Sequence, residues 1–372
     1  MPKLSFDRFL HPRGLHLTNL GRLATQSLRR PTTGPLRMFL CIADHYEPMR
    51  DHPPRSVQQE RVDRWRREYP AHVAGLTDSR GRPPQHTFFY PIEEYAPEFL
   101  DPLAELCRQG YGEVEIHLHH DNDHADRLRE SLLGFARLLH ERHGLLDKDA
   151  AGRITYGFIH GNWALDNARP DGRWCGVNDE LTVLRETGCY ADFTLPCAPA
   201  PGQTRTINGI YYAVDDPLRP KSHDRGTPAC VGRPAPPGSL LLVQGPLGLD
   251  WRRRKWGLLP RLENGTLQGN QPPTMERLPL WLAAGVSVIG RPDWRFVKLH
   301  THGALEQNAA VLLGEPTRRF HESLAAYAQQ TPGFEYYYVT AREMAALVHQ
   351  AEAGLTTPDW DALQCYVSRS PQ

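Results

Sequence analysis

The sequence has few lysines, no excess of either charge and no long apolar run. Lysine occurs only at positions 3, 148, 221, 255 and 298, and 43 basic side chains balance 43 acidic ones. Non-specific binding to nucleic acid or to anionic lipid needs a surplus of cations. The charge balance therefore argues against either of these as a partner.

The seven cysteines are scattered along the chain and include no Cys-x-x-Cys pair. This argues against a zinc knuckle or a redox motif, and disulfide frameworks are typical of much smaller chains. No stretch reaches the roughly 20 apolar residues that a membrane span needs, and the first 31 residues lack the apolar run of a secretory signal. We therefore expect reduced thiols, a cytoplasmic location and no integral membrane segment.

Short apolar runs alternate with amphipathic stretches along most of the chain, as buried strands and helices do. The predicted strands span residues 36–43, 86–90, 113–119, 154–159, 190–195, 239–244, 295–300 and 336–339. The predicted helices span residues 56–75, 97–109, 124–143, 178–187, 275–284 and 315–328, with a last helix whose Thr340 and Glu343 fit a capping box. This alternation implies a parallel sheet or an α/β barrel.

Residues 196–273 interrupt the alternation, because proline and glycine accumulate there. We expect this region to be a loop elaboration beside the functional site rather than a second domain. The chain then divides into an N-terminal extension (1–35), one α/β unit (36–350) and a C-terminal tail (351–372).

Histidine is abundant, with 18 residues, and histidines gather where predicted strands end. The carboxyl ends of strands carry the functional site in α/β sheets and barrels, so these positions are the ones that matter. Side chains alternate along a strand, so His117 and His119 share one face, as do His300 and His302. A turn could bring Asp123 beside His119, or His124 beside His120. The polar residues at or directly after the ends of four predicted strands are Asp44 and His45; His117, His119, His120 and Asp123; His160; and His300 and His302.

Imidazole and carboxylate ligands together suit Zn, Fe, Ni or Co, and three protein ligands with an open position suit hydrolysis. A metal there would polarise a carbonyl and lower the pKa of its water. A neighbouring carboxylate could act as general base and a histidine as general acid. The spacing alone therefore predicts a metal-dependent hydrolase.

The order of these motifs resembles the polysaccharide deacetylases, the carbohydrate esterase family four or NodB-homology superfamily. Ile42-Ala43-Asp44-His45 stands where that family has its Asp-Asp pair, and Thr87-Phe88-Phe89 matches its Thr-Phe-Phe strand. The stretch from Gly112 to Asp123 fits its Glu-Ile-Gly-x-His-x-x-x-His frame, with His119 and Asp123 on the two metal histidines. The family's Arg-x-Pro-Tyr segment is replaced by Ile159-His160-Gly161-Asn162-Trp163, which marks a divergent branch.

The resemblance implies an α/β fold in the form of a distorted (β/α) barrel and a divalent metal, with Zn expected first and Co, Ni or Fe as alternatives. It implies that Asp44 is the catalytic base and that His300 protonates the leaving group. The implied metal ligands are His45, His119 and Asp123. The groove residues expected to bind substrate are His117, His160, Trp163, Asp192 and His302. The implied reaction is removal of an N- or O-linked acetyl group from a carbohydrate.

Two other interpretations stay open. His117-Leu118-His119 and His300-Thr301-His302 also resemble the His-x-His pairs of amidohydrolase barrels and of polymerase-and-histidinol-phosphatase barrels, although those folds place the pair on the first strand. A barrel that binds saccharide without catalysis is the other. The sequence leaves the sugar, the metal and the oligomeric state undetermined.

Overall fold

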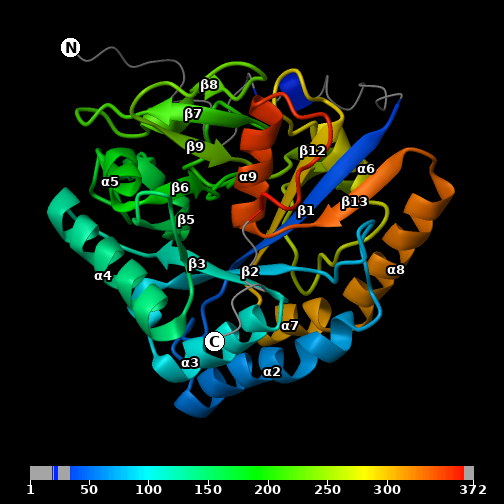
Figure 1. Cartoon of the computed structure of the whole chain (residues 1–372), viewed down its shortest axis with the longest axis horizontal. Helices are drawn as coiled ribbons and strands as arrows, with labels where there is room; N and C mark the ends of the chain where they lie inside the picture. The colour runs from blue at the N-terminus through cyan, green and yellow to red at the C-terminus, as the bar shows by residue number, and fades with distance from the viewer. Residues whose placement is uncertain (1–18, 20, 24–33, 364–372) are drawn as a thin grey trace.

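β1 (Leu36–His45) is an apolar strand that pairs in parallel with three others, and the rest of the sheet extends from it (Figure 1). The computed structural model describes residue 19, residues 21–23 and residues 34–363. In that part of the chain, no helix has both the length and the apolarity required to cross a membrane.

Eleven strands form one curved, mostly parallel sheet. Pairing is parallel from β12 to β9, whereas β7, β8 and β4 pair antiparallel with their neighbours. The order along the sheet is β12 (Trp294–Thr301), β1, β2 (His86–Pro91), β3 (Gly112–Leu118), β5 (Ile154–His160), β6 (Cys189–Asp192), β9 (Ser239–Val243), β7 (Ile210–Val214) and β8 (Thr227–Pro228), with β13 (Phe334–Tyr338) beside β1 and β4 (Asp147–Lys148) beside β5. The predicted parallel α/β sheet is confirmed.

The backbone ladders among the described residues do not join β12 to β9, so closure into a barrel stays a prediction. A side chain connects β12 with the residues that follow β6. The ammonium of Lys298, on β12, donates hydrogen bonds to the carbonyl oxygens of Phe193 and Leu195, which follow β6. Because Lys298 is buried, these carbonyls replace the water that its charge would otherwise need.

Alternation along β1 divides the core into two layers. Leu40 and Ile42 pack with the helices on the outer side of the sheet, whereas Phe39 and Cys41 pack with the buried face of α9 (Ala341–Glu352). Figure 1 shows α2, α3, α4 and α8 along the outer side and α9 in front of the centre of the sheet. The predicted capping box of Thr340 and Glu343 begins α9. The other helices are α2 (Arg55–Val73), α3 (Pro97–Arg108), α4 (Ala125–His143), α5 (Glu180–Thr187), α6 (Leu278–Ala284), α7 (Glu306–Leu312) and α8 (Glu315–Gln330).

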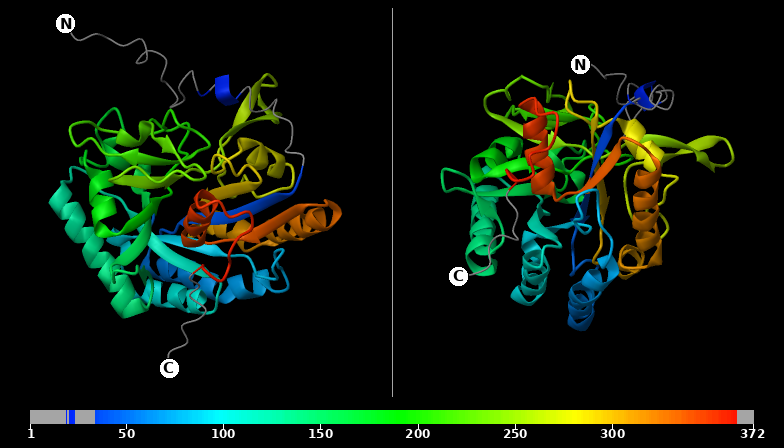
Figure 2. Two further views of the ribbon diagram at one scale, coloured as in Figure 1. Left: turned by 45° about the horizontal axis from the view of Figure 1, so that its top comes forward. Right: turned by 45° about the vertical axis from the view of Figure 1, so that its right-hand side comes forward.

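The region predicted as loops, 196–273, contains more regular structure than its composition indicated. It supplies β7, β8 and the predicted β9 to the sheet, and within the described part of the chain β10 (Gly248–Lys255) pairs only with β11 (Leu259–Glu263). Figure 2 shows this two-stranded ribbon projecting from the body of the molecule. Most of its side chains are exposed and many are charged, so it lacks the apolar alternation by which a strand is recognised.

Both proposed terminal segments are described only in part. Most of the extension 1–35 lies outside the described residues, but Leu23 packs against Ala198, Ile207 and Leu247. The tail 351–372 is described as far as residue 363, and the ring of Trp360 lies 4.7 Å from that of Tyr337. The described parts of both segments therefore pack against the α/β unit.

Glu113 provides a test of how the interior of the sheet responds to pH. Its buried carboxylate accepts a hydrogen bond from the backbone N–H of Arg342 (2.9 Å). Burial, followed by the charge of Glu115, raises its pKa from 4.5 to about 8. A carboxyl group whose pKa is higher in the folded protein than in the unfolded chain stabilises the fold less as pH rises between those two values.

We therefore expect Glu113→Gln to become progressively more stable than the parent protein between about pH 5 and about pH 8. Urea unfolding at a series of pH values measures this difference. The exposed Glu130 on α4 is the control, because Glu130→Gln should leave the pH dependence unchanged. Parallel pH curves for the parent and Glu113→Gln would show that Glu113 is ionised in the folded protein.

Candidate metal centre

The end of β1 directs two potential ligands to the same side. His45 is the last residue of the strand and Glu47 lies two positions later, so alternation places both on one face. Asp44 and Tyr46, which alternate with them along the chain, face the opposite side, where the Tyr46 hydroxyl donates to the carbonyl oxygen of Arg61 on α2. The Glu47 carboxylate is buried, with a side-chain exposure of 4%.

β3 brings two imidazoles to that carboxylate. The Nδ1 atom of His117 lies 2.7 Å from the carbonyl oxygen of Ile159, and Nδ1 of His119 lies 2.5 Å from Glu93 Oε1. Both partners accept hydrogen bonds, so each Nδ1 carries the proton and each Nε2 of the neutral ring has a free lone pair. These Nε2 atoms lie 3.2 Å (His117) and 3.5 Å (His119) from Glu47 Oε1.

β12 supplies another imidazole to this site. The His302 Nε2 lies 3.9 Å from Glu47 Oε1, and its ring centre is 4.9 Å from that of His45. We call His45, Glu47, His117, His119 and His302 the Glu47 cluster. Its ligand atoms form two overlapping groups, one of His45, Glu47 and His302 and one of Glu47, His117 and His119.

The charges in this cluster suit a bound cation. Burial and then the nearby imidazoles hold the pKa of His45 well below its usual value, and burial lowers the pKa of His302 to about 4. Burial acts to raise the pKa of Glu47, but its contact with His117 and the nearby His302 and Arg50 hold it well below the usual range. The neutral imidazole and the ionised carboxylate are the forms that bind metals. His119 differs from His45 and His302, because burial acts to lower its pKa but the hydrogen bond and charge of Glu93 and the charge of Glu47 raise it.

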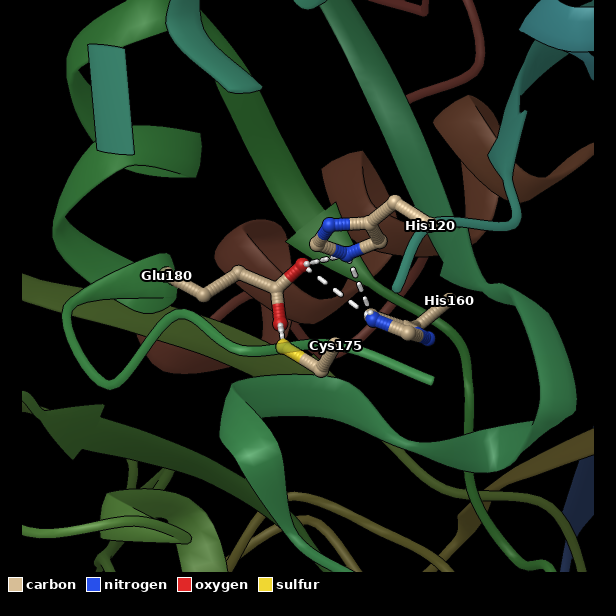
Figure 3. Close-up of side chains that lie close together, drawn as sticks. All are labelled: His120, His160, Cys175 and Glu180. Carbon is tan, nitrogen blue, oxygen red and sulfur yellow. Dashed lines mark hydrogen bonds and ion pairs between the residues drawn. The ribbon is translucent and has the colours of Figure 1, made fainter. Parts of the chain in front are cut away.

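A second group of potential ligands lies at the ends of β3 and β5 (Figure 3). Nε2 of His120 is 2.8 Å from Nε2 of His160 and 3.2 Å from Glu180 Oε1, and His160 Nε2 is 3.5 Å from the same oxygen. The Cys175 thiol lies 3.4 Å from Glu180 Oε2. We call His120, His160, Cys175 and Glu180 the Glu180 cluster.

The structure divides the predicted metal ligands between these two places. His45 and His119 belong to the Glu47 cluster, whereas Asp123 Oδ2 lies 3.0 Å from Nδ1 of His120 and orients the Glu180 cluster instead. The expected pairing of Asp123 with His119, four positions earlier, does not occur. His124 also does not pair with His120, because its ring caps α4 by accepting from the Arg127 N–H.

Asp44 does not face the site for which the resemblance proposed it as the base. It is fully buried, its Oδ1 accepts from the Gly303 N–H (2.6 Å), and its Oδ2 lies 2.8 Å from His86 Nε2. The physical reason is alternation, since Asp44 and His45 are consecutive on one strand and point to opposite faces. Asp44 fixes the turn that follows His302.

The other predicted residues lie around the clusters. The ring of His300 is buried, with its centre 6.3 Å from that of His45, and burial with nearby Lys298 keeps its pKa well below the usual value. Asp192 is buried and accepts from the N–H (3.1 Å) and the hydroxyl (2.7 Å) of Thr194. Trp163 stands beside His45, with ring centres 6.3 Å apart. His117 and His302 are members of the Glu47 cluster and His160 of the Glu180 cluster, so three predicted substrate-binding histidines occupy ligand positions.

Sequence reasoning missed Glu47, Glu93, Cys175 and Glu180 and gave no role to His120. Glu47 could have been found, because it lies two positions from His45 and the same alternation paired His117 with His119. Glu180 begins α5, 60 residues after His120, and no local pattern connects the two.

No protein-family model and no curated protein matches this chain. Among the solved structures, it is similar to the 4-alpha-glucanotransferase from Thermococcus litoralis at 12% sequence identity and a TM-score of 0.43. The alignment covers 84% of this chain and 40% of that enzyme, so the chain spans less than half of its length. A similarity of this size carries no argument about activity.

Gly161 separates the two clusters and sets the position of His119. A Cβ atom at this position would collide with the His119 ring and with the Leu118 carbonyl oxygen. We expect Gly161→Ala to displace the ring and to weaken metal retention at the Glu47 cluster by about 10- to 100-fold, as changes around metal ligands do. Metal content after dialysis against a series of chelator concentrations measures this loss.

Gly134→Ala is the matched control, since Gly134 lies within α4 and has open space around its Cα. It should leave metal retention unchanged and stabilise the helix by roughly 1 kcal/mol. If Gly161→Ala folds normally and retains metal as well as the parent protein does, His119 does not depend on this close approach.

Proposed function

We propose that this protein is a divalent-metal-dependent hydrolase and that its metal ion is held by the Glu47 cluster. One observation carries the proposal. Two imidazole Nε2 lone pairs, each fixed by a hydrogen bond at the opposite ring nitrogen, converge on one buried carboxylate oxygen of Glu47 at the carboxyl ends of parallel strands. Acceptors that converge in this way repel one another unless a cation lies between them.

The side chains of the Glu47 cluster are ligands that suit a divalent metal ion. Glu47, His117 and His119 make a three-ligand set of two imidazoles and one carboxylate, and His45 and His302 form an overlapping set with the same carboxylate. Zn²⁺ is the first candidate, with Co²⁺, Ni²⁺ or Fe²⁺ as alternatives. When bound, such an ion supplies Lewis acidity toward a carbonyl oxygen and toward water.

The residues around the cluster position these ligands. Ile159 and Glu93 fix the ring orientations of His117 and His119, as partners of metal-binding histidines do. Asp44 holds the Gly303 N–H and thereby the turn that carries His302, so we assign it a positioning role rather than that of a base. His119, at 28% exposure, and Glu93, at 37%, connect the site to solvent.

We further propose that the substrate is an acylated carbohydrate and that the curved sheet corresponds to the distorted (β/α) barrel of the polysaccharide deacetylases. The support is the order of the motifs, with metal-type ligands following the first and third predicted strands. Trp163 adds a second feature, because an aromatic face beside the cluster suits a sugar ring. Its indole N–H is buried and has no hydrogen-bond partner among the described residues.

The test is a metal-depletion and reconstitution experiment on the full chain. Protein stripped with a chelator, and then reloaded with Zn²⁺, Co²⁺ or Ni²⁺, is assayed for acetate release from N-acetylated oligosaccharides and from an aryl acetate. We expect release only from the reloaded protein. Equal release by the stripped protein contradicts the metal, and phosphate release from sugar phosphates in place of acetate release would identify a phosphoesterase.

A further inference from the structure

We propose that the Glu180 cluster binds a second divalent ion, Zn²⁺ by the chemistry of its donors, through His120, His160, Glu180 and Cys175. This site is separate from the Glu47 cluster and does not depend on the function proposed for that cluster.

The hydrogen bonds of His120 and His160 fix which nitrogen of each ring carries the proton. Nδ1 of His120 faces the Asp123 carboxylate at 3.0 Å, and Nδ1 of His160 faces the Gly161 carbonyl oxygen at 2.5 Å. Both partners are acceptors, so both Nδ1 atoms carry protons and both Nε2 atoms of the neutral rings present lone pairs. The two Nε2 atoms are 2.8 Å apart, and Glu180 Oε1 lies 3.2 Å from Nε2 of His120 and 3.5 Å from Nε2 of His160. Two lone pairs and a carboxylate oxygen therefore point at one another.

Only a cation satisfies three converging acceptors, and it can be a proton or a metal ion. A single proton on His120 Nε2 can be donated fully to one acceptor, either His160 Nε2 or Glu180 Oε1. The other acceptor then remains buried without a donor, which costs free energy. A metal ion between the three atoms satisfies all of them together.

The fourth donor favours the metal ion. All four ligand atoms of the cluster lie within 4.8 Å of one another. Burial and the charge of Glu180 raise the pKa of the Cys175 thiol, whereas the backbone N–H groups of Asn167 (3.3 Å) and Val177 (3.4 Å), which Sγ accepts, act in the direction of a thiolate. In a tetrahedral zinc site, with Zn–N near 2.0 Å and Zn–S near 2.3 Å, ligand atoms lie roughly 3.3–3.7 Å apart. The separations among the two imidazole nitrogens and Glu180 Oε1, 2.8, 3.2 and 3.5 Å, lie within about half an ångström of that range.

The charges of the bound ion and of its four ligands would also cancel. The Glu180 side chain is fully buried, and its second oxygen accepts the Asp166 N–H at 2.5 Å. Ion binding releases the Cys175 thiol proton to solvent and leaves one dication with one carboxylate, one thiolate and two neutral imidazoles. This set has no net charge, which is the condition under which buried charges cost least.

The position of the cluster indicates what the ion does. Its ligands come from the ends of β3 and β5, from the irregular segment 161–179, and from the first residue of α5. Several residues in that segment have left-handed backbone conformations, including Asp166 and Trp174. An ion bound by all four ligands would hold the segment 161–179 against the sheet, next to Gly161 and the Glu47 cluster.

The experiment counts metal ions per chain by elemental analysis of the purified protein. We expect about two ions in the parent, loss of one ion in Glu180→Gln and Cys175→Ser, and loss of the other in Glu47→Gln. Glu186→Gln is the matched control on α5, because that side chain is 41% exposed and lies outside the cluster. If Glu47→Gln keeps every ion while Glu180→Gln loses one, the proposed function fails and this proposal stands.

Spectroscopy tests the same ligand set, and its zinc-edge measurement on the parent protein covers the case in which a variant fails to fold. Cobalt-loaded protein should show a thiolate-to-cobalt charge-transfer band that is present in Glu47→Gln and absent in Cys175→Ser. X-ray absorption at the zinc edge of the parent should likewise require sulfur in the coordination shell. Nitrogen and oxygen ligands alone, together with an unchanged ion count in Glu180→Gln, would overturn the proposal and identify a proton shared between His120 and its neighbours.

Discussion

Replacing Glu47 by glutamine is expected to remove the ion of the Glu47 cluster and the hydrolytic activity with it. Glutamine keeps the size of the side chain but has no charge, so the imidazoles of His117 and His119 lose the carboxylate on which they converge. Changes in the partners of metal ligands already cost about 10- to 100-fold in affinity or activity, and removal of a ligand should cost more. Metal content and acetate release, measured on the same preparation, test this.

The same substitution at an exposed carboxylate shows whether the losses of metal and activity are specific to Glu47. Glu68 lies on α2 with its side chain 36% exposed, and Glu68→Gln should keep both metal and activity. A Glu47→Gln protein that is folded and fully active would show that the chemistry takes place elsewhere. A folded variant that has lost activity but kept its ion would make Glu47 a reacting group rather than a ligand.

The fold was predictable because it rests on local periodicity. The run at 36–43 became β1, and the pairing of Thr340 with Glu343 began α9 as expected. Such patterns depend on neighbours in the sequence, where apolar spacing directly reports which side chains are buried. The β10–β11 ribbon was missed for the same reason, because its exposed residues carry no such pattern.

The location of the site at the ends of the strands could be predicted from the sequence, but the set of ligands could not. Histidines at the ends of predicted strands did come together, because parallel strands end at one edge of the sheet. The pairing of His117 and His119 followed from alternation, and their rings lie 4.5 Å apart. The same rule excluded Asp44 from the face that carries His45, whereas the family resemblance had assigned both to one site.

What the sequence could not supply was contact over long separations and the orientation of rings. Asp123 joins His120 because the turn after β3 directs those two side chains away from His119. Glu180 reaches the same place only because α5 packs beside the end of β5, a contact set by tertiary structure. Neither relation has a fixed spacing that a motif could record.

Arg277→Met is expected to give the largest loss of stability among single changes outside the two clusters. Arg277 and Glu263 form a buried, bidentate ion pair with both N···O distances at 2.8 Å. The guanidinium also donates to the carbonyl oxygens of Gln271, Pro272 and Thr266. Removing one partner of a buried pair leaves the other charge without compensation, which typically costs about 3–5 kcal/mol. Urea unfolding of the variant and the parent measures the difference.

Loss of the Arg277–Glu263 pair should also affect the Glu47 cluster, because this pair anchors the segment that follows β11. Next to Thr266, the Leu267 N–H donates to the His300 carbonyl at 2.7 Å, and the Gly265 carbonyl accepts the His300 N–H at 3.0 Å. This backbone pairing lies two residues before His302, so loosening it should lower turnover in addition to stability. The double variant Arg277→Met/Glu263→Gln separates the causes. Removing the carboxylate charge should recover part of the lost stability, whereas a double variant less stable than the single one would show that the uncompensated charge of Glu263 is not the reason for the loss.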